Sequence, residues 1–328
     1  MIITRTPFRI TLGGGGTDLS AYYSRHGGFI FAAAISRYMY VYVNRPVVDD
    51  LIRVKYSKTE VVTRRDEVQH EIVREAMRRM DVENAIEIIS MADVPAGTGL
   101  GSSSCYTVGL LNALHHLKRD YIALNVLAEE ASDLEINGLG KPIGKQDQYM
   151  AAFGGLTILE ISREGKVSVR KVNAAESVIN DLNRNLLMFY TGVQRNANDI
   201  LSSQSKVLSE EGSRALESMH YIKEIGYKIL AAVESGNITD VGLLFDQHWA
   251  YKKKMNPLTT NPRFDEIYSL ARGCGALGGK ISGAGGGGFF LFYVEKDHEK
   301  FRTEMAKIGL REMKYGFDFE GSRLLLNI

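Results

Sequence analysis

The sequence predicts an α+β protein built from two domains. From residue 2 to residue 172, many segments have the apolar pattern that is typical of β-strands. Beyond residue 190 the pattern changes to long amphipathic helices. The stretch between these parts, Glu176–Arg184, is polar and weakly periodic, so we place the domain boundary there. We therefore expect one domain at residues 1–180 and a second at residues 181–328.

The composition excludes several classes of protein. Of 328 residues, 45% are hydrophobic and 24% are charged, which is typical of a globular chain. The formal net charge of +1 gives no reason to expect binding to nucleic acid or to an anionic membrane. No apolar run is long enough to span a membrane and no signal peptide is evident, so a cytoplasmic protein is expected. Two cysteines, Cys105 and Cys274, are too few for a disulfide framework.

The first domain is expected to combine strands with amphipathic helices. Alternating or continuous apolar residues predict strands at Ile2–Thr11, Gly28–Asn44 (one long strand or a hairpin), Leu51–Tyr56, Ala85–Ser90, Met150–Ile161 and Val167–Val172. Apolar residues at helical spacing predict helices at Leu19–Arg25, Glu67–Met80, Ser102–Leu117 and Ile122–Ile136.

The second domain is expected to be richer in helices. Its predicted strands are Leu186–Tyr190, Phe289–Val294, Lys314–Phe319 and Arg323–Asn327. Its predicted helices are one that ends near Val207, then Glu211–Glu234, Ile238–Lys254, Arg263–Cys274 and Lys296–Ile308.

The most informative segment precedes the helix at Ser102. Gly97-Thr98-Gly99-Leu100-Gly101 allows the backbone to approach a ligand closely, and Ser102, Ser103 and Ser104 are good helix N-cap residues. A helix start offers unpaired N–H groups and partial positive charge, so this segment predicts a phosphate-binding loop. The alternative is an ordinary glycine loop capped by serine.

Two further glycine clusters need an explanation, because ordering glycine costs entropy. Gly13–Gly16 precede Asp18, an acceptor suited to sugar hydroxyls, although Asp18 could instead cap the next helix. Gly283, Gly285 and Gly288 match G-x-G-x-x-G, but they lead into a strand rather than a helix, which excludes a dinucleotide site. The chain has no G-x-x-x-x-G-K-[ST] motif of a P-loop NTPase.

Carboxylates between residues 129 and 147 are candidates for chemistry. The helix Ile122–Ile136 is acidic, and one of its carboxylates facing a phosphate could hold Mg²⁺, although most would simply be solvated. Asp147 lies among polar residues expected to form a turn before the Met150–Ile161 strand. Such a carboxylate is a candidate general base, or else an ordinary turn residue.

The three glycine clusters together resemble the three motifs of the GHMP small-molecule kinases, in family order and spacing. These motifs are Pro7-x-Arg9 through Thr17-Asp18, Pro95 through Ser104, and Gly279-Lys280-x-Ser282-Gly283-Ala284-Gly285. Within the family, the four glycines and the runs Gly144–Tyr149 and Tyr190–Arg195 resemble the D-glycero-D-manno-heptose 7-phosphate kinases. Those enzymes phosphorylate the anomeric hydroxyl of a seven-carbon sugar phosphate.

The resemblance implies a ribosomal-protein-like N-terminal domain with a left-handed βαβ unit, a ferredoxin-like C-terminal domain, and ATP and Mg²⁺ as cofactors. The catalytic residues would be Asp147, as the base, and Arg9, which would favour the ionised carboxylate. The implied ATP-binding residues are Pro95, Gly97, Gly99, Leu100, Gly101, Ser102, Ser103 and Ser104. Ser103 or Ser104 and Glu135 would ligate Mg²⁺. The implied substrate-binding residues are Gly14, Gly15, Gly16, Thr17, Asp18, Arg195, Lys280, Gly283, Ala284 and Gly285.

One departure from the family pattern bears on the substrate. Galactokinases have Gly-Glu-His where this chain has Gly14-Gly15-Gly16. The change leaves room for a longer substrate and removes a charge that would repel a phosphate. Candidates to bind that phosphate are Arg195, Lys280 and Lys252–Lys254, although the last three also suit a helix C-terminus.

The sequence is also compatible with two other functions. One is a kinase of an unphosphorylated sugar such as fucose or galactose, and another is a non-catalytic sugar sensor on the same fold. The expected partner is a small sugar phosphate, with neither nucleic acid nor a membrane, and a homodimer is a possible assembly.

Overall fold

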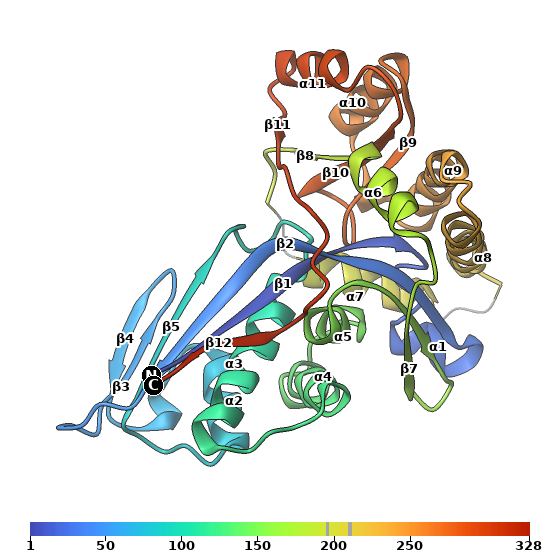
Figure 1. Cartoon of the computed structure of the whole chain (residues 1–328). Coiled ribbons are helices and arrows are strands. Elements are labelled where there is room, and N and C mark those ends of the chain that lie inside the picture. Colours follow the sequence, from blue (N-terminus) through green and yellow to red (C-terminus); the bar gives the residue numbers. More distant parts are fainter. Residues whose placement is uncertain (195–196, 209–211) are drawn as a thin grey trace.

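Two β-sheets form the framework of the molecule (Figure 1). The computed structural model describes residues 1–194, 197–208 and 212–328. The first sheet runs in the order β12-β1-β2-β5-β3-β4, and β2 also pairs with β6, which pairs with β7. Its strands are β1 (Ile2–Gly13), β2 (Gly28–Asn44), β3 (Ile52–Lys55), β4 (Thr59–Val62), β5 (Ile86–Ala92), β6 (Leu156–Ile161), β7 (Val167–Lys171) and β12 (Arg323–Asn327).

The long strand β2 organises this sheet. One half of it, Gly28–Ala33, pairs with β6, and the other half, Met39–Asn44, pairs with β5. The sequence was compatible with either one long strand or a hairpin in this segment, and the structure has a single strand. The strand β3 is parallel to β5 and reaches it through β4, a 3₁₀ turn (Arg65–Glu67) and α2. This segment is the βαβ unit of the first domain.

Helices cover the first sheet and carry part of the site. The helix α3 packs against β1 and β2, and α4 and α5 pack beside it. These helices are α1 (Ser20–His26), α2 (Glu71–Arg79), α3 (Ser102–Lys118), α4 (Leu124–Asp133), a π-helical turn (Leu134–Gly138) and α5 (Gln146–Phe153).

The second sheet lies at the other end of the molecule and has the antiparallel order β11-β8-β10-β9. Its strands are β8 (Leu186–Tyr190), β9 (Ala276–Ile281), β10 (Phe289–Val294) and β11 (Arg311–Glu312). The remaining helices are α6 (Glu176–Asn185), α7 (Ala197–Leu208), α8 (Arg214–Ser235), α9 (Thr239–Met255), a 3₁₀ turn (Pro257–Thr259), α10 (Pro262–Gly273) and α11 (His298–Lys307). The helix α8 also contacts β1 and β2, and α9 contacts β9 (Figure 1). The two sheets are therefore joined through α8 and α9.

Several local predictions were wrong. Residues 150–153 belong to α5 rather than to a strand, because a short apolar run fits a buried helix as well as a strand. Glu176–Arg184 is not irregular but forms most of α6. Of the predicted strand Lys314–Phe319, only an isolated bridge between Phe317 and Ile35 is present. None of the helices in the described ranges has the length and apolarity needed to cross a bilayer.

Candidate active site

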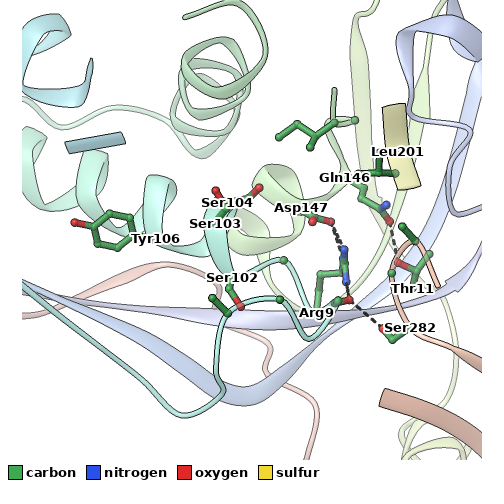
Figure 2. A pocket seen from close by; sticks show the side chains of 18 of the residues that line it. Arg9, Thr11, Ser102, Ser103, Ser104, Tyr106, Gln146, Asp147, Leu201 and Ser282 are labelled. Atoms are coloured by element: carbon green, nitrogen blue, oxygen red, sulfur yellow. Dashed lines mark hydrogen bonds and ion pairs between the residues drawn. The ribbon is translucent and has the colours of Figure 1, made fainter. Parts of the chain in front are cut away.

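A cavity of about 920 Å³ lies where β1, the start of α3, α5, α9 and β9 meet. Figure 2 shows part of its wall, with Arg9 and Asp147 pointing toward each other and three serines at the start of α3. Residues from both sheets line the cavity, which brings the three glycine clusters of the sequence to one place.

The loop before α3 presents bare backbone to this cavity. Gly97, Gly99 and Gly101 have φ angles of +77°, +79° and +84°, a region in which glycine is strongly favoured. Gly101 is the helix N-cap, and the serines are the first three helical residues rather than caps, so the predicted capping role was wrong. The first-turn N–H groups have no acceptor within the helix and lie at its positive end. The loop and the helix start can therefore bind a phosphate group.

Glu135 is buried beside this helix start. The π-helical turn after α4 presents it, and such turns are common at functional sites. Ser103 Oγ donates a hydrogen bond to Glu135 Oε1 (2.5 Å), Gln148 Nε2 donates to Oε2 (2.8 Å), and Lys141 Nζ lies 3.5 Å from Oε1. The side chains of Glu135 and Ser103 supply only oxygen atoms, which suits Mg²⁺ held by few protein ligands.

Arg9 and Asp147 form an ion pair across the cavity wall. Arg9 Nε and Nη2 lie 2.7 and 2.5 Å from Asp147 Oδ1, and Arg9 Nη1 donates to the carbonyl oxygen of Gly99 at 2.8 Å (Figure 2). Asp147 lies in the first turn of α5, where a carboxylate is favoured by the helix dipole. The Arg9 side chain is only 4% exposed, whereas that of Asp147 is 23% exposed and remains accessible from the cavity. The pair therefore connects the glycine loop before α3 to an accessible carboxylate.

Asp18 lies on the cavity wall near this pair. Its carboxylate accepts hydrogen bonds from the N–H of Gln146 (3.1 Å) and of Gly16 (3.2 Å), and it does not cap α1, whose N-cap is Leu19. Burial raises the pKa of Asp18 to about 6, the charge of Asp147 adds to this effect, and the Gln146 hydrogen bond opposes it. At neutral pH Asp18 is therefore mostly ionised and can accept a hydrogen bond from a sugar hydroxyl.

The four-glycine segment has two roles. A Cβ on Gly14 would lie 1.9 Å from the carbonyl oxygen of Phe29, so this glycine is required by packing. Thr17 is fully buried and its hydroxyl bonds the backbone of Phe29. Gly15 and Gly16 do line the cavity. Only half of the segment can therefore present bare backbone to a bound substrate.

The third glycine cluster packs on the glycine loop that precedes α3. A Cβ on Gly283 would lie 2.7 Å from the carbonyl oxygen of Gly99, and one on Gly288 would lie 2.0 Å from that of Thr98. Ser282 Oγ also donates to the Gly99 oxygen at 3.3 Å. These glycines let the second sheet approach the loop of the first domain.

Most predicted site residues line the cavity, and a few do not. Those on the wall are Arg9, Gly15, Gly16, Asp18, Pro95, Gly97, Gly99, Gly101, Ser102, Ser103, Ser104, Glu135, Asp147, Lys280, Gly283 and Ala284. Those away from the wall are Gly14, Thr17, Leu100 and Gly285. Arg195 lies outside the described residues.

One end of the cavity is aromatic, a feature that was not predicted from the sequence. Tyr56, His70 and Tyr106 line it, with the His70 ring 4.7 Å from that of Tyr56 and 5.1 Å from that of Tyr106. Burial lowers the pKa of His70, which favours a neutral ring. Within the described ranges, Ser102 Oγ, Tyr106 Oη and His70 Nδ1 are buried without a hydrogen-bond partner. This end of the cavity can therefore take a flat, polar-edged ring system.

The chain is similar to known kinases of one family. The model of the GHMP kinases N-terminal domain matches residues 68–155, and that of the GHMP kinases C-terminal domain matches residues 229–309. A D-glycero-alpha-D-manno-heptose 7-phosphate kinase from Campylobacter jejuni is 29% identical over 97% of this chain and 96% of its own length. An L-fucokinase/L-fucose-1-P guanylyltransferase from Bacteroides fragilis is 27% identical over 89% of this chain, which spans only 34% of that protein.

A solved structure extends the similarity to the whole fold. The crystal structure of a D-glycero-D-manno-heptose 1-phosphate kinase from Bacteroides thetaiotaomicron matches all of this chain and all of its own, with a TM-score of 0.82 at 23% identity. The predicted two-domain fold is therefore confirmed. The chain belongs to the GHMP kinase family.

Proposed function

We propose that this GHMP kinase is an ATP-dependent sugar kinase that phosphorylates the anomeric hydroxyl of D-glycero-D-manno-heptose 7-phosphate, giving the 1,7-bisphosphate. The observation that carries the proposal is the Arg9–Asp147 ion pair, which lies between a phosphate-binding loop and the Asp18 region of the same cavity. A phosphoryl acceptor bound there would have a carboxylate beside it. The similarity to the heptose 7-phosphate kinase over nearly the whole chain supports the choice of sugar.

ATP is assigned to the half of the cavity that contains the α3 N-terminus. Its phosphates would contact the backbone of Gly97–Gly101 and the first-turn N–H groups of α3. The adenine ring would lie against Tyr106, His70 and Tyr56, where the unpartnered polar atoms can bond its edge. Ser103 and Glu135 would hold Mg²⁺, which when bound neutralises charge on the ATP phosphates.

The acceptor is assigned to the other half of the cavity. Asp18 would accept a hydrogen bond from a sugar hydroxyl, and the bare backbone of Gly15 and Gly16 would leave room for a long sugar. Asp147 would lie next to the anomeric hydroxyl. With the two substrates in these halves, the acceptor hydroxyl would face the γ-phosphate, as in-line phosphoryl transfer requires.

Asp147 and Arg9 then act on the transfer itself. The sugar oxygen forms a bond to the γ-phosphorus as the bond from that phosphorus to the β–γ bridging oxygen breaks, and ADP departs with the electron pair. Asp147 accepts the hydroxyl proton. Arg9 holds the Asp147 carboxylate in place and adds positive charge near the transferred group.

Two other functions predict different behaviour. A kinase of unphosphorylated sugars would use the same base and nucleotide site, and the similarity to the L-fucokinase protein favours it over the other alternative. A sugar sensor would bind sugar without turnover. A sensor needs neither a base nor a metal ligand. The paired carboxylate of Asp147 and the buried carboxylate of Glu135 therefore favour an enzyme over a sensor.

The test is ADP release from Mg·ATP, coupled to NADH oxidation, with a panel of acceptors. The panel is D-glycero-D-manno-heptose 7-phosphate, the unphosphorylated heptose, mannose 6-phosphate, fucose, galactose and mevalonate. We expect much the highest kcat/KM with the heptose phosphate and slow turnover with the unphosphorylated heptose. A preference for a free sugar would refute the proposed substrate, and tight sugar binding without turnover would support the sensor.

A further inference from the structure

One face of α9 contributes basic side chains to the acceptor half of the cavity. His248, Lys252 and Met255 follow one another at spacings of four and three residues, so they share a face of the helix, and all three line the cavity. Lys280, from β9, lines the same cavity. Figure 1 shows that α9 and β9 run beside each other, and Lys280 of β9 donates a hydrogen bond to the carbonyl oxygen of Leu12, near the end of β1.

Lys280 is a basic side chain buried beside the cavity. Its side chain donates to the carbonyl oxygen of Leu12 at 2.5 Å and lies 4.6 Å from the centre of the Phe245 ring. In the part of the chain that the structure describes, no carboxylate is recorded as its ion-pair partner or as acting on its pKa, and the residue is only 3% exposed. Burial lowers the pKa of Lys280 well below its usual value, and the charge of Lys252 lowers it further. Burying a charge without a counter-ion is costly, so this position favours an anionic ligand.

His248 has unused hydrogen-bonding capacity at the same place. It is 2% exposed, and across the described ranges neither Nδ1 nor Nε2 has a hydrogen-bond partner. Buried polar atoms are nearly always paired, so two orphan nitrogens on one buried ring call for an explanation. Burial lowers the pKa of His248 well below its usual value, and the charges of Lys280 and Lys252 add to the effect. The three side chains are therefore close enough to influence one another electrostatically.

The position of this cluster is next to the acceptor rather than the nucleotide. Gln204 Nε2 contacts Met255 Sδ at 3.5 Å, and a Cβ on Gly16 would lie 2.8 Å from the same nitrogen. The α9 face thus adjoins Gly16 on one side. Lys252 donates to the carbonyl oxygens of Ile281 and Gly283, which places the third glycine cluster against its other side.

We propose that Lys280, His248 and Lys252 bind the phosphate group that the acceptor sugar already carries. This inference rests on the proposed function, in which the acceptor is a sugar phosphate. In a heptose 7-phosphate the anomeric hydroxyl and the phosphate are at opposite ends of the carbon chain, so the phosphate must bind away from Asp147. A phosphate dianion would accept hydrogen bonds from Lys280 and from an imidazole N–H, and it would supply the counter-ion that Lys280 lacks.

A purely structural role for the lysines makes a different prediction. Both ammonium groups bond backbone carbonyls, and they could do no more than hold β1, β9 and the third glycine cluster together. Their loss would then weaken the fold and impair both substrates alike. A phosphate-binding role instead predicts an effect that depends on the acceptor phosphate.

The experiment compares Lys280→Met and His248→Phe with Lys253→Met as the matched control. Lys253 loses the same charge one residue from Lys252, but its Nζ pairs with Asp265 at 3.0 Å and it does not line the cavity. We measure kcat and KM for the heptose 7-phosphate, for the unphosphorylated heptose and for ATP, together with thermal unfolding. For Lys280→Met and His248→Phe we expect the KM for the heptose phosphate to rise about 10- to 100-fold, as for loss of a charge-assisted hydrogen bond. The KM for ATP and kcat/KM for the free heptose should change by less than about threefold, and Lys253→Met should resemble the wild type.

The outcomes separate the two proposals. If the wild type uses the heptose phosphate and the variants raise all KM values equally or not at all, this inference is overturned while the proposed function stands. If the wild type uses only free sugars, both are wrong. If Lys280→Met fails to fold, the same comparison is made with Lys280→Gln and His248→Phe. The glutamine of Lys280→Gln can still donate a hydrogen bond to the Leu12 carbonyl.

Discussion

Replacing Asp147 with asparagine tests the central chemical assumption. The two side chains have the same shape, and the asparagine oxygen can still accept hydrogen bonds from the Arg9 guanidinium, which now contacts Oδ1 through Nε and Nη2. What is lost is the negative charge and the ability to accept a proton. The substitution therefore removes the base while leaving the surrounding contacts largely in place.

The expected magnitude follows from this role. General-base catalysis contributes about 10²- to 10⁴-fold to a rate, or about 3 to 5 kcal/mol of transition-state stabilisation. We expect kcat of Asp147→Asn to fall by that factor. ATP affinity should change by less than about threefold, because the phosphate-binding backbone of Gly97–Gly101 is untouched and Arg9 Nη1 keeps its bond to the Gly99 oxygen.

The assay combines coupled ADP release with calorimetric titration of a non-hydrolysable ATP analogue. Asp133→Asn is the control, because Asp133 also pairs with an arginine (Arg79 Nη1, 2.6 Å) but lies outside the cavity. It should retain the wild-type turnover. Near-normal turnover in Asp147→Asn would remove Asp147 as the base. A loss of ATP affinity as large as the loss of turnover would show instead that Asp147 serves nucleotide binding.

The remaining predictions concern the metal ligand, a glycine contact and a titrating group. Glu135→Gln should raise the Mg²⁺ concentration for half-maximal turnover at least about tenfold, whereas Glu129→Gln, outside the cavity, should not. Gly288→Ala should lower the free energy of unfolding by more than Gly309→Ala. Both have positive φ (+86° and +82°) and share a backbone cost of about 1–2 kcal/mol, but only at Gly288 would the Cβ meet a carbonyl oxygen, at 2.0 Å. Because the pKa of Asp18 is raised from 3.8 to about 6, its contribution to stability is present below pH 3.8 and lost as pH rises through 6. Denaturant unfolding of the wild type relative to Asp18→Asn should show this loss, and the acceptor KM of the wild type should rise below pH 6; a flat pH profile in both would contradict the assignment.

The parts of the site that the sequence predicted are those encoded by local pattern. The glycine loop before α3 needs positive φ at Gly97, Gly99 and Gly101, and only glycine adopts this readily, so the requirement is visible in the sequence itself. The resemblance of three such clusters to one family then brought Arg9 and Asp147 together although 138 residues separate them. No local pattern could have done so.

The parts that the sequence missed depend on contacts between distant segments. Gly14 is glycine because of the Phe29 backbone, and nothing near it in the sequence shows this contact. In the sequence, His248 has no feature that separates it from other helix residues. Its burial, and the absence of hydrogen-bond partners for its ring nitrogens among the described residues, follow from the packing of α9 against β9. Residues 150–153 were assigned to a strand because a four-residue apolar run carries no period that separates a buried helix from a buried strand.

A single backbone carbonyl shows why the two domains must act together. The oxygen of Gly99 accepts a hydrogen bond from Arg9 Nη1 on β1 and another from Ser282 Oγ in the third glycine cluster. The first contact ties the glycine loop before α3 to Arg9 and through it to Asp147, and the second ties the loop to the segment whose Gly283 oxygen bonds Lys252. With the nucleotide and the base where we propose them, a shift of this loop would move the nucleotide relative to Asp147 and to Lys252. Because in-line transfer tolerates little displacement, the close glycine contacts between the domains would then serve catalysis as well as packing.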